Sequence, residues 1–171
     1  MPIYTKRGDK GNTSTLDKPL SKSDLRIRAI GALDEANTLL GLAASFVEDV
    51  EVREKITALQ ESLFKINSIL AGANIRFGES ATKKLEKGID EMDKELPVLK
   101  NFIFPGGAKA GAFLHVARAV VRRGERELTE YAKTEKVKPA IQMYVNRLSD
   151  YVFTLARYVN MKAGKEEQVW D

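Results

Sequence analysis

Residues 23–47 read SDLRIRAIGALDEANTLLGLAASFV, and this stretch decides the fold. Its apolar side chains return at steps of three and four residues, which places them on one face of an α-helix. They are Ile27, Ile30, Leu33, Ala36, Leu40, Ala43 and Val47. Ser23 and Asp24 are both suitable N-caps, because their side-chain oxygens accept hydrogen bonds from free N–H groups. We therefore predict a helix from Ser23 to about Phe46.

The same period continues along the chain and predicts four further helices. They run from about Val52 to Ile75, from Ser80 to Leu96, from Ala108 to Lys133, and from Pro139 to at least Val159. Ser80 is the expected cap of the third helix. No alternating strand pattern is longer than Ile3-Tyr4, and the connections are short. The predicted fold class is therefore all-α, a five-helix up-and-down bundle.

The 171 residues suffice for one domain that buries a core without disulfides. Residues 1–22 are predicted to form a loop, residues 23–163 the bundle, and residues 164–171 a polar, frayed tail. No apolar run approaches the roughly 18 to 20 residues of a membrane span. The N-terminus also lacks the apolar segment of a secretion signal. We expect a cytoplasmic protein with no membrane partner.

The amino-acid composition excludes several kinds of catalytic and metal site. The sequence has no Cys and one His, His115, which excludes thiol nucleophiles and Cys/His zinc sites. His115 lies near the apolar side of its predicted helix, so we expect a structural histidine with satisfied hydrogen bonds. Trp170 is expected to anchor packing or an interface. Chemistry is left to Arg, Lys, Asp, Glu, Asn and backbone groups.

The N-terminal segment carries the positive charge of the chain. Seven basic and three acidic residues give residues 1–28 a net charge of +4, the whole excess of the sequence. Residues 4–14 read YTKRGDKGNTS, in which the glycines allow N–H groups to turn toward an anion. The lysines and threonines add charge and hydroxyl groups, although the Walker A pattern is absent. The segment is either a phosphate-binding loop or a flexible basic arm.

Arginines line one face of the predicted helix 108–133. Arg118, Arg122 and Glu125 share that face, and Arg126 continues the row. The face is either a solvated basic surface or an anion site. Gly124 in the middle of this helix costs about 1 kcal/mol relative to Ala, which indicates close packing against a neighbouring helix.

Two other helices carry polar groups beside their apolar stripes. Asp34 and Glu35 lie in the middle of the helix 23–46, where a carboxylate near the core needs a cation. Arg118 or Arg122 would serve. One face of the last helix carries three polar residues: Asn146, Asp150 and Thr154. A local ion pair with Arg147 is the alternative explanation for this polar face.

Five blocks of the sequence, taken in order, resemble one known family. They are residues 5–13 (TKRGDKGNT), 31–37 (GALDEAN), 102–107 (FIFPGG), 115–126 (HVARAVVRRGER) and 145–151 (VNRLSDY). With these blocks the chain resembles the PduO-type ATP:cob(I)alamin adenosyltransferases from Tyr4 to about Asn160. The resemblance implies a five-helix bundle that forms a homotrimer with an active site at each subunit interface. It also implies transfer of the 5′-deoxyadenosyl group of ATP to the cobalt of reduced cobalamin, releasing triphosphate, with Mg²⁺ as cofactor.

The resemblance implies roles for single residues. The N-terminal loop would bind ATP through Thr5, Lys6, Gly8, Asp9, Gly11 and Thr13, with Lys18 and Lys22 as further phosphate contacts. The nucleotide would also contact Arg122, Glu125 and Asn146, of which Glu125 is the implied Mg²⁺ ligand. Asp34 and Arg118 match an ion pair across the subunit interface at the cobalamin site, and Phe102 matches the aromatic residue beneath the corrin ring. The implied catalytic set is Arg122, Phe102, Asp34 and Arg118.

Two other functions remain open at this point. One is a carrier that binds nucleotide or cobalamin without catalysis and delivers adenosylcobalamin to an enzyme. The other is a helical protein that binds nucleic acid through the basic arm, with steep salt dependence. No recognised nucleic-acid motif supports the second, so we expect no nucleic-acid partner. The enzyme reading implies two protein partners, a cobalamin reductase and an adenosylcobalamin-dependent enzyme.

Overall fold

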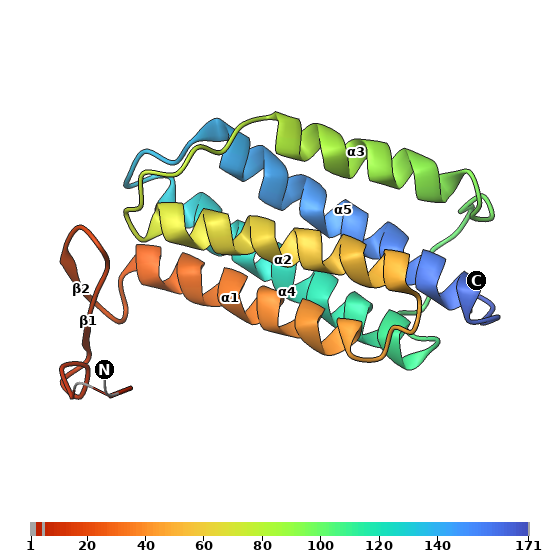
Figure 1. The fold of residues 1–171 in the computed structure, drawn as a ribbon, viewed down its shortest axis with the longest axis horizontal. Coiled ribbons are helices and arrows are strands. Elements are labelled where there is room, and N and C mark those ends of the chain that lie inside the picture. The colour runs from red at the N-terminus through yellow and green to blue at the C-terminus, as the bar shows by residue number, and fades with distance from the viewer. Residues whose placement is uncertain (1–2, 5, 171) are drawn as a thin grey trace.

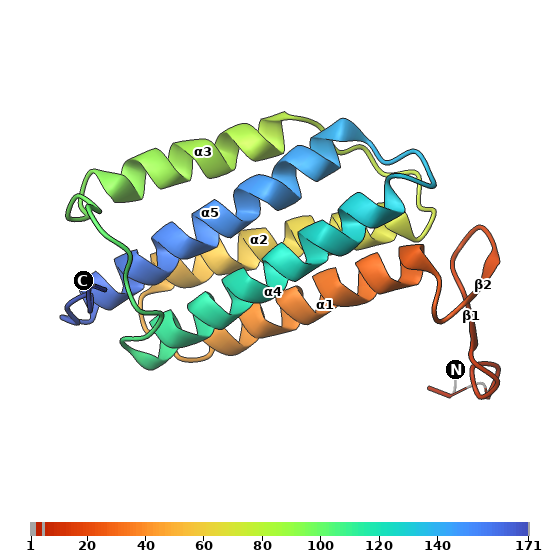
Figure 2. The same ribbon diagram turned by 180° about the vertical axis from the view of Figure 1, so that it is seen from behind.

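Five helices form an up-and-down bundle in the residues that the computed structural model describes, 3–4 and 6–170. They are α1 (Leu25–Ala44), α2 (Val50–Leu70), α3 (Ser80–Asp93), α4 (Lys109–Tyr131) and α5 (Pro139–Lys162). Figures 1 and 2 show the helices side by side, with the first described residues and the C-terminal residues at opposite ends of the bundle. The predicted all-α fold is confirmed. None of these helices is long and apolar enough to cross a membrane.

The core lies along the predicted apolar stripes. Leu33 and Leu40 of α1, Leu114 of α4 and Leu148 of α5 are fully buried. At Gly124 a Cβ atom would lie 2.8 Å from Cδ2 of Leu33. Because a side chain does not fit there, glycine lets α1 and α4 approach closely. The close packing expected from a glycine inside α4 is confirmed.

Some predicted helix ends were wrong. The second helix ends at Leu70 and not at Ile75, because Gly72 turns the chain at φ 101°, where side chains are strained. Ser80 is not the cap of α3: the N-cap residue is Glu79, which makes no side-chain capping bond, and Ser80 is the first helical residue. Of the two candidate caps for α1, Asp24 is used, and it accepts a bond of 2.8 Å from the N–H of Arg26.

A small hairpin precedes the bundle, in a segment that was predicted to be only a loop. Strand β1 (Asn12–Ser14) pairs antiparallel with β2 (Pro19–Ser21), and Thr13 lies opposite Leu20. The hairpin projects from the end of the bundle at which α1 begins (Figures 1 and 2). Strands of three residues are too short to produce a recognisable alternation, which is why the pattern showed only a loop.

The C-terminal residues are held against the bundle, so the expectation of a frayed tail was wrong for residues 164–170. The N–H of Phe104 donates to the carbonyl of Gln168 at 2.8 Å, and the N–H of Trp170 donates to the carbonyl of Phe102 at 2.9 Å. Glu167 accepts from the buried Arg157 at 2.6 Å. Polar composition alone predicted a frayed segment, because it does not show that Glu167 is the counter-charge of the buried Arg157.

Candidate active site

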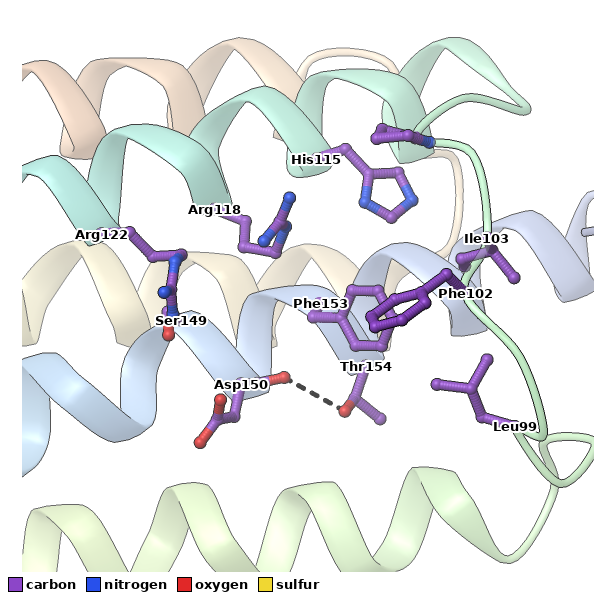
Figure 3. Close-up of a pocket in the computed structure, with 11 residues that line it drawn as sticks. Leu99, Phe102, Ile103, His115, Arg118, Arg122, Ser149, Asp150, Phe153 and Thr154 are labelled. Carbon is purple, nitrogen blue, oxygen red and sulfur yellow. Dashed lines mark hydrogen bonds between the residues drawn. The ribbon is translucent and has the colours of Figure 1, made fainter. Parts of the chain in front are cut away.

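A cavity of about 390 Å³ lies where residues 99–105 approach α4 and α5 (Figure 3). His115, Arg118 and Arg122 of α4 form one wall. Asp150 and Phe153 of α5 and Phe102 of the connecting segment lie across from them. The fold therefore brings together three of the predicted site residues: Phe102, Arg118 and Arg122.

The turn before α4 is held by Asn160 of α5. Its side-chain Nδ2 donates to the carbonyl of Gly106 at 2.8 Å, and its Oδ1 accepts from the N–H of Ala108 at 3.0 Å. A Cβ atom at Gly107 or Gly111 would lie within 2.4 Å of this amide oxygen, and Gly107 has φ 105°. Glycine is required at both positions for this close contact, which fixes where the segment bearing Phe102 leaves the bundle.

The cationic wall is built from consecutive turns of α4. The guanidinium of Arg118 lies over the ring of Phe153, 5.9 Å from its centroid. Burial, and next the positive charge of Arg122, lowers the pKa of Arg118. Its Nε is buried and has no hydrogen-bond partner in the described part of the chain. Arg118 and Arg122 thus line a cavity that favours an anion, whereas Arg126 does not line it.

Glu125 and Asn146 meet beyond the cavity. The Nδ2 atom of Asn146 donates to Oε1 of Glu125 at 2.7 Å, which joins α4 to α5. Glu125 lies one turn after Arg122 on α4. The three residues predicted to contact the nucleotide, Arg122, Glu125 and Asn146, are therefore neighbours. Within the described residues no group of three or more His, Asp or Glu side chains could hold a metal ion.

The apolar part of the cavity is lined by the rings of Phe102 and Phe153 together with Leu99, Ile103 and Pro105. Phe102 is 79% exposed, and its ring centroid lies 6.4 Å from that of Trp170. Trp170 was expected to anchor packing or an interface, and its ring contact with Phe102 is a packing contact. Phe153 was missed as a site residue, because an apolar residue on a core-forming helix carries no separate signal. A flat apolar surface of this kind suits a large planar ligand.

The three polar residues on this face of α5 lie in two different places. Asp150 and Thr154 line the cavity, whereas Asn146 contacts Glu125. The alternative of a local ion pair is also confirmed, since Arg147 donates to Asp150 at 2.6 Å.

Asp34 and Glu35 were expected beside the core, and this expectation was wrong. Both residues are exposed on α1, because the apolar stripe passes on the other side of the helix. Glu35 pairs with Arg123 and not with Arg118 or Arg122. In the described part of the chain Asp34 makes no ion pair with Arg118.

The described residues of the N-terminal loop do not line the cavity of their own chain. The hairpin is at the end of the bundle where α1 begins, and the segment before α4 is at the opposite end (Figures 1 and 2). Lys6 (φ 58°) and Gly11 (φ 79°) have left-handed backbones, which turn the loop tightly. The other predicted ATP residues that the structure describes follow the same loop: Gly8, Asp9 and Thr13. Thr5 lies outside the described residues.

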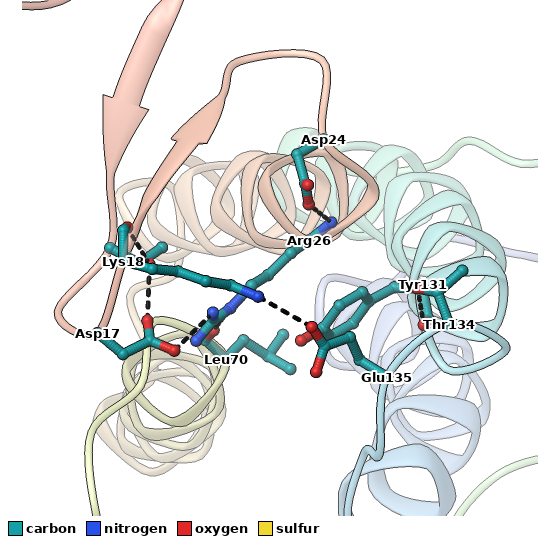
Figure 4. Close-up of polar contacts among 9 residues, drawn as sticks. Asp17, Lys18, Asp24, Arg26, Leu70, Tyr131, Thr134 and Glu135 are labelled. Carbon is teal, nitrogen blue, oxygen red and sulfur yellow. Dashed lines mark hydrogen bonds and ion pairs between the residues drawn. The ribbon is translucent and has the colours of Figure 1, made fainter.

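Two predicted phosphate contacts have other neighbours in this structure. The ammonium of Lys18 donates to Glu135 at 2.9 Å (Figure 4). Lys22 lies against the loop, with its Nζ atom 3.2 Å from where a Cβ of Gly8 would be. Neither lysine reaches the cavity between α4 and α5.

His115 does not have the satisfied hydrogen bonds expected of a structural histidine. It is 4% exposed, and neither Nδ1 nor Nε2 has a partner in the described part of the chain. Its ring lies edge-on to Phe153, with 6.0 Å between centroids. Burial, and next the charge of Arg118, lowers the pKa of the imidazole, so the ring is neutral near pH 7.

Comparison with known proteins identifies the family. Residues 3–159 match the family model described as cobalamin adenosyltransferase. The chain is 38% identical to the corrinoid adenosyltransferase of Bacillus subtilis, covering 96% of this chain and 89% of that protein. It is 35% identical to that of Homo sapiens, covering 98% and 72%.

A solved structure shows the same fold. It is a variant of the PduO-type ATP:corrinoid adenosyltransferase from Lactobacillus reuteri complexed with cobalamin and ATP, with a TM-score of 0.95 and 33% identity over 99% of both chains. A second variant of that enzyme, complexed with ATP, has a TM-score of 0.94 and 34% identity, covering 99% of this chain and 100% of that one. This chain therefore belongs to the cobalamin adenosyltransferase family, as a member of the PduO type.

Proposed function

We propose that the cavity between α4, α5 and residues 99–105 is where the 5′-deoxyadenosyl group of ATP is transferred to the cobalt of cob(I)alamin. One observation carries the assignment: a cationic wall of Arg118 and Arg122 faces an aromatic end formed by Phe102 and Phe153. The first suits a polyphosphate and the second a flat macrocycle. The products are adenosylcobalamin and triphosphate.

The reaction needs little covalent help from the protein. Cobalt in cob(I)alamin is already a strong nucleophile, so a site without Cys or a general base is adequate. A bond forms between cobalt and C5′, the C5′–O bond breaks, and its electron pair leaves with triphosphate. Arg122 stabilises the negative charge that gathers on this leaving group. Holding cobalt and C5′ in line contributes roughly 7 to 11 kcal/mol through proximity.

Phe102 excludes water and an axial ligand from the lower face of the corrin ring. Its ring is exposed on a segment that Asn160 and the C-terminal residues hold in place. Without a lower ligand the cobalt becomes four-coordinate, which makes its reduction to Co(I) easier.

The residues at Glu125 fit a magnesium ion. Glu125 offers one carboxylate, and the amide of Asn146 holds it at 2.7 Å. Mg²⁺ is commonly held by one or two carboxylates together with water and substrate phosphates, so a larger acidic cluster is unnecessary. When bound there, the ion would neutralise phosphate charge beside Arg122.

A homotrimer with active sites between subunits belongs to the same proposal. The N-terminal loop and the segment between α3 and α4 lie at opposite ends of the bundle of one chain. Asp34 is exposed, and the buried Nε of Arg118 has no partner within the described residues. A second copy would supply the ATP loop to the nucleotide part of the site and Asp34 to its cobalamin part.

The chemistry also defines the setting of the enzyme. Co(I) is readily oxidised, so a reductase must supply it in a reducing compartment, which we take to be the cytoplasm. An adenosylcobalamin-dependent enzyme would receive the product.

An anaerobic assay with chemically reduced cobalamin, ATP and Mg²⁺ tests the function. Coupled loss of the Co(I) spectrum and release of triphosphate are expected. ATP binding without either product would favour the carrier function instead. Binding of nucleic acid with steep salt dependence, and no transfer, would favour the nucleic-acid function.

A further inference from the structure

The turn of the N-terminal hairpin, residues 15–18, is docked on the end of α2. The N–H of Leu16 donates to the carbonyl of Ala71 at 2.8 Å. A Cβ atom at Gly72 would lie 2.9 Å from Cγ of Asp17, and Gly72 has φ 101°. Glycine adopts this backbone conformation without strain and leaves room for the Asp17 side chain. The chain just after α2 is therefore shaped to receive the turn.

Arg26 joins this turn to two helices (Figure 4). It lies in the first turn of α1 and is 6% exposed. Its Nε donates to the carbonyl of Leu70, one of the last carbonyls of α2, which have no partner within the helix. Its Nη1 donates to Oδ2 of Asp17 at 2.9 Å, and Oγ1 of Thr15 donates to Oδ1 at 2.7 Å. One buried guanidinium therefore fixes α1, α2 and the turn to one another.

The loop proposed to bind ATP is at the other end of the same hairpin. It precedes β1, and the N–H of Lys22, just after β2, donates to the carbonyl of Gly11 at 2.9 Å. Between this bond and the turn, β1 and β2 pair through Asn12 with Ser21, Thr13 with Leu20 and Ser14 with Pro19. An isolated two-stranded hairpin is at best marginally stable in water. Docking of the turn on the bundle therefore also holds the loop.

Asp17 and Arg26 are placed to act on the loop and not on a ligand. Neither residue lines the cavity between α4 and α5. Both carboxylate oxygens of Asp17 already accept hydrogen bonds within the chain. A buried charge is costly unless it is paired, and moving the turn would leave Arg26 without its counter-charge. The position of the turn is therefore tightly restricted.

We propose that Asp17 and Arg26 are positioning residues for ATP: they hold the hairpin so that its loop is already in place when the nucleotide binds. This inference rests on the proposed function, in which the loop binds ATP at the site of a second copy of the chain. Neither residue contacts the substrate. A loop that has lost this support must be ordered during binding, and that ordering lowers the affinity for ATP.

Asp17→Ala tests the proposal kinetically. The KM for ATP should rise about tenfold, since ordering the loop then opposes binding. The value of kcat at saturating ATP and the KM for cob(I)alamin should change little, because the bound loop makes the same contacts. Asp17→Asn keeps an oxygen that can accept from Arg26, so it should restore part of the affinity. Circular dichroism checks that the helices remain.

Hydrogen exchange tests the same proposal without any turnover. The amide of Leu16 reports docking of the turn, and the amide of Lys22 reports closure of the loop, because each makes one of the bonds described above. Both amides should exchange faster in Asp17→Ala than in the wild type. Faster exchange at Leu16 with no change at Lys22 would overturn the proposal, since the turn would then not hold the loop.

Glu127→Ala is the matched control. Glu127 of α4 pairs at 2.9 Å with Arg28, which lies two residues after Arg26 on α1, and this pair joins the two helices without the hairpin. The variant should leave the KM for ATP and the exchange of Leu16 and Lys22 unchanged. An equal rise in the KM for ATP would assign the effect to this end of the bundle in general and overturn the proposal.

Two results separate this proposal from the function on which it rests. An unchanged KM for ATP in a folded Asp17→Ala protein would overturn the positioning role while leaving the transfer reaction intact. A wild-type protein that binds no ATP would instead refute the proposed function. Exchange at the amide of Lys22 would still decide in that case whether Asp17 and Arg26 hold the loop.

Discussion

The two ends of the chain are attached to the bundle in different ways. The N-terminal hairpin is held by Asp17 on Arg26 and by Lys18 on Glu135 (Figure 4). Arg26 is buried, but the side chains of both carboxylates are exposed, at 45% for Asp17 and 50% for Glu135. The C-terminal segment is held by Glu167 on Arg157, a pair in which the carboxylate is only 20% and the guanidinium 5% exposed. Exposed pairs contribute little to stability, whereas breaking a buried pair is costly. The C-terminal segment is therefore the more firmly held of the two ends.

The largest expected effect is on catalysis, at the cavity end. Arg122→Ala should lower kcat by about 10²- to 10³-fold, because it removes a cation that stabilises the leaving triphosphate. The anaerobic assay measures the rate, and circular dichroism checks that the helices remain. Arg126→Ala is the control, since Arg126 is one turn further along α4 and does not line the cavity. Normal turnover in a folded Arg122→Ala protein would contradict the phosphate role.

The contrast between the two ends is tested by removing one carboxylate from each. Glu167→Gln leaves Arg157 buried without a counter-charge, and we expect a loss of about 3 kcal/mol in the free energy of unfolding. Glu135→Gln removes the exposed partner of Lys18 and should change stability little. Urea titration of both variants measures the difference. Equal losses would mean that the two ends are held alike.

Asp34→Asn tests whether a second copy completes the site. We expect the KM for cobalamin to rise by about tenfold, in line with the loss of a charged hydrogen bond, while ATP affinity is retained. Glu35→Gln on the neighbouring position is the control, because Glu35 pairs with Arg123 in its own chain. An isolated loss of ATP binding in Asp34→Asn would count against the interface role.

The smallest effect concerns acid stability of the hairpin end. The hydrogen bond from Arg26 lowers the pKa of Asp17 from 3.8 to about 2. Because the folded pKa is the lower one, the stabilisation is present above pH 4 and is lost as the pH falls from 4 to 2. The melting temperature of Asp17→Asn should therefore be below that of the wild type at pH 6 and approach it at pH 2. A difference that does not depend on pH would refute the ionic contribution.

Much of the site could be predicted because family resemblance and helical spacing point to the same residues. Arg118 and Arg122 lie four apart, so a helix places them on one face wherever the bundle puts that face. Phe153 and the unpaired state of His115 could not be predicted in this way. Both depend on which side of α5 packs against α4. That is decided by contacts between residues about forty positions apart in the sequence.

The sequence by itself determined the five helices, their order and the all-α class, because the spacing of apolar residues is a local property that every helix repeats. It also determined the family, through blocks that can be compared one by one. Only the tertiary structure decided that residues 164–170 hold the segment of Phe102, and that Asp34 faces solvent. It also showed that His115 is buried without a partner. Such features arise from contacts between residues distant in sequence, which no local period records.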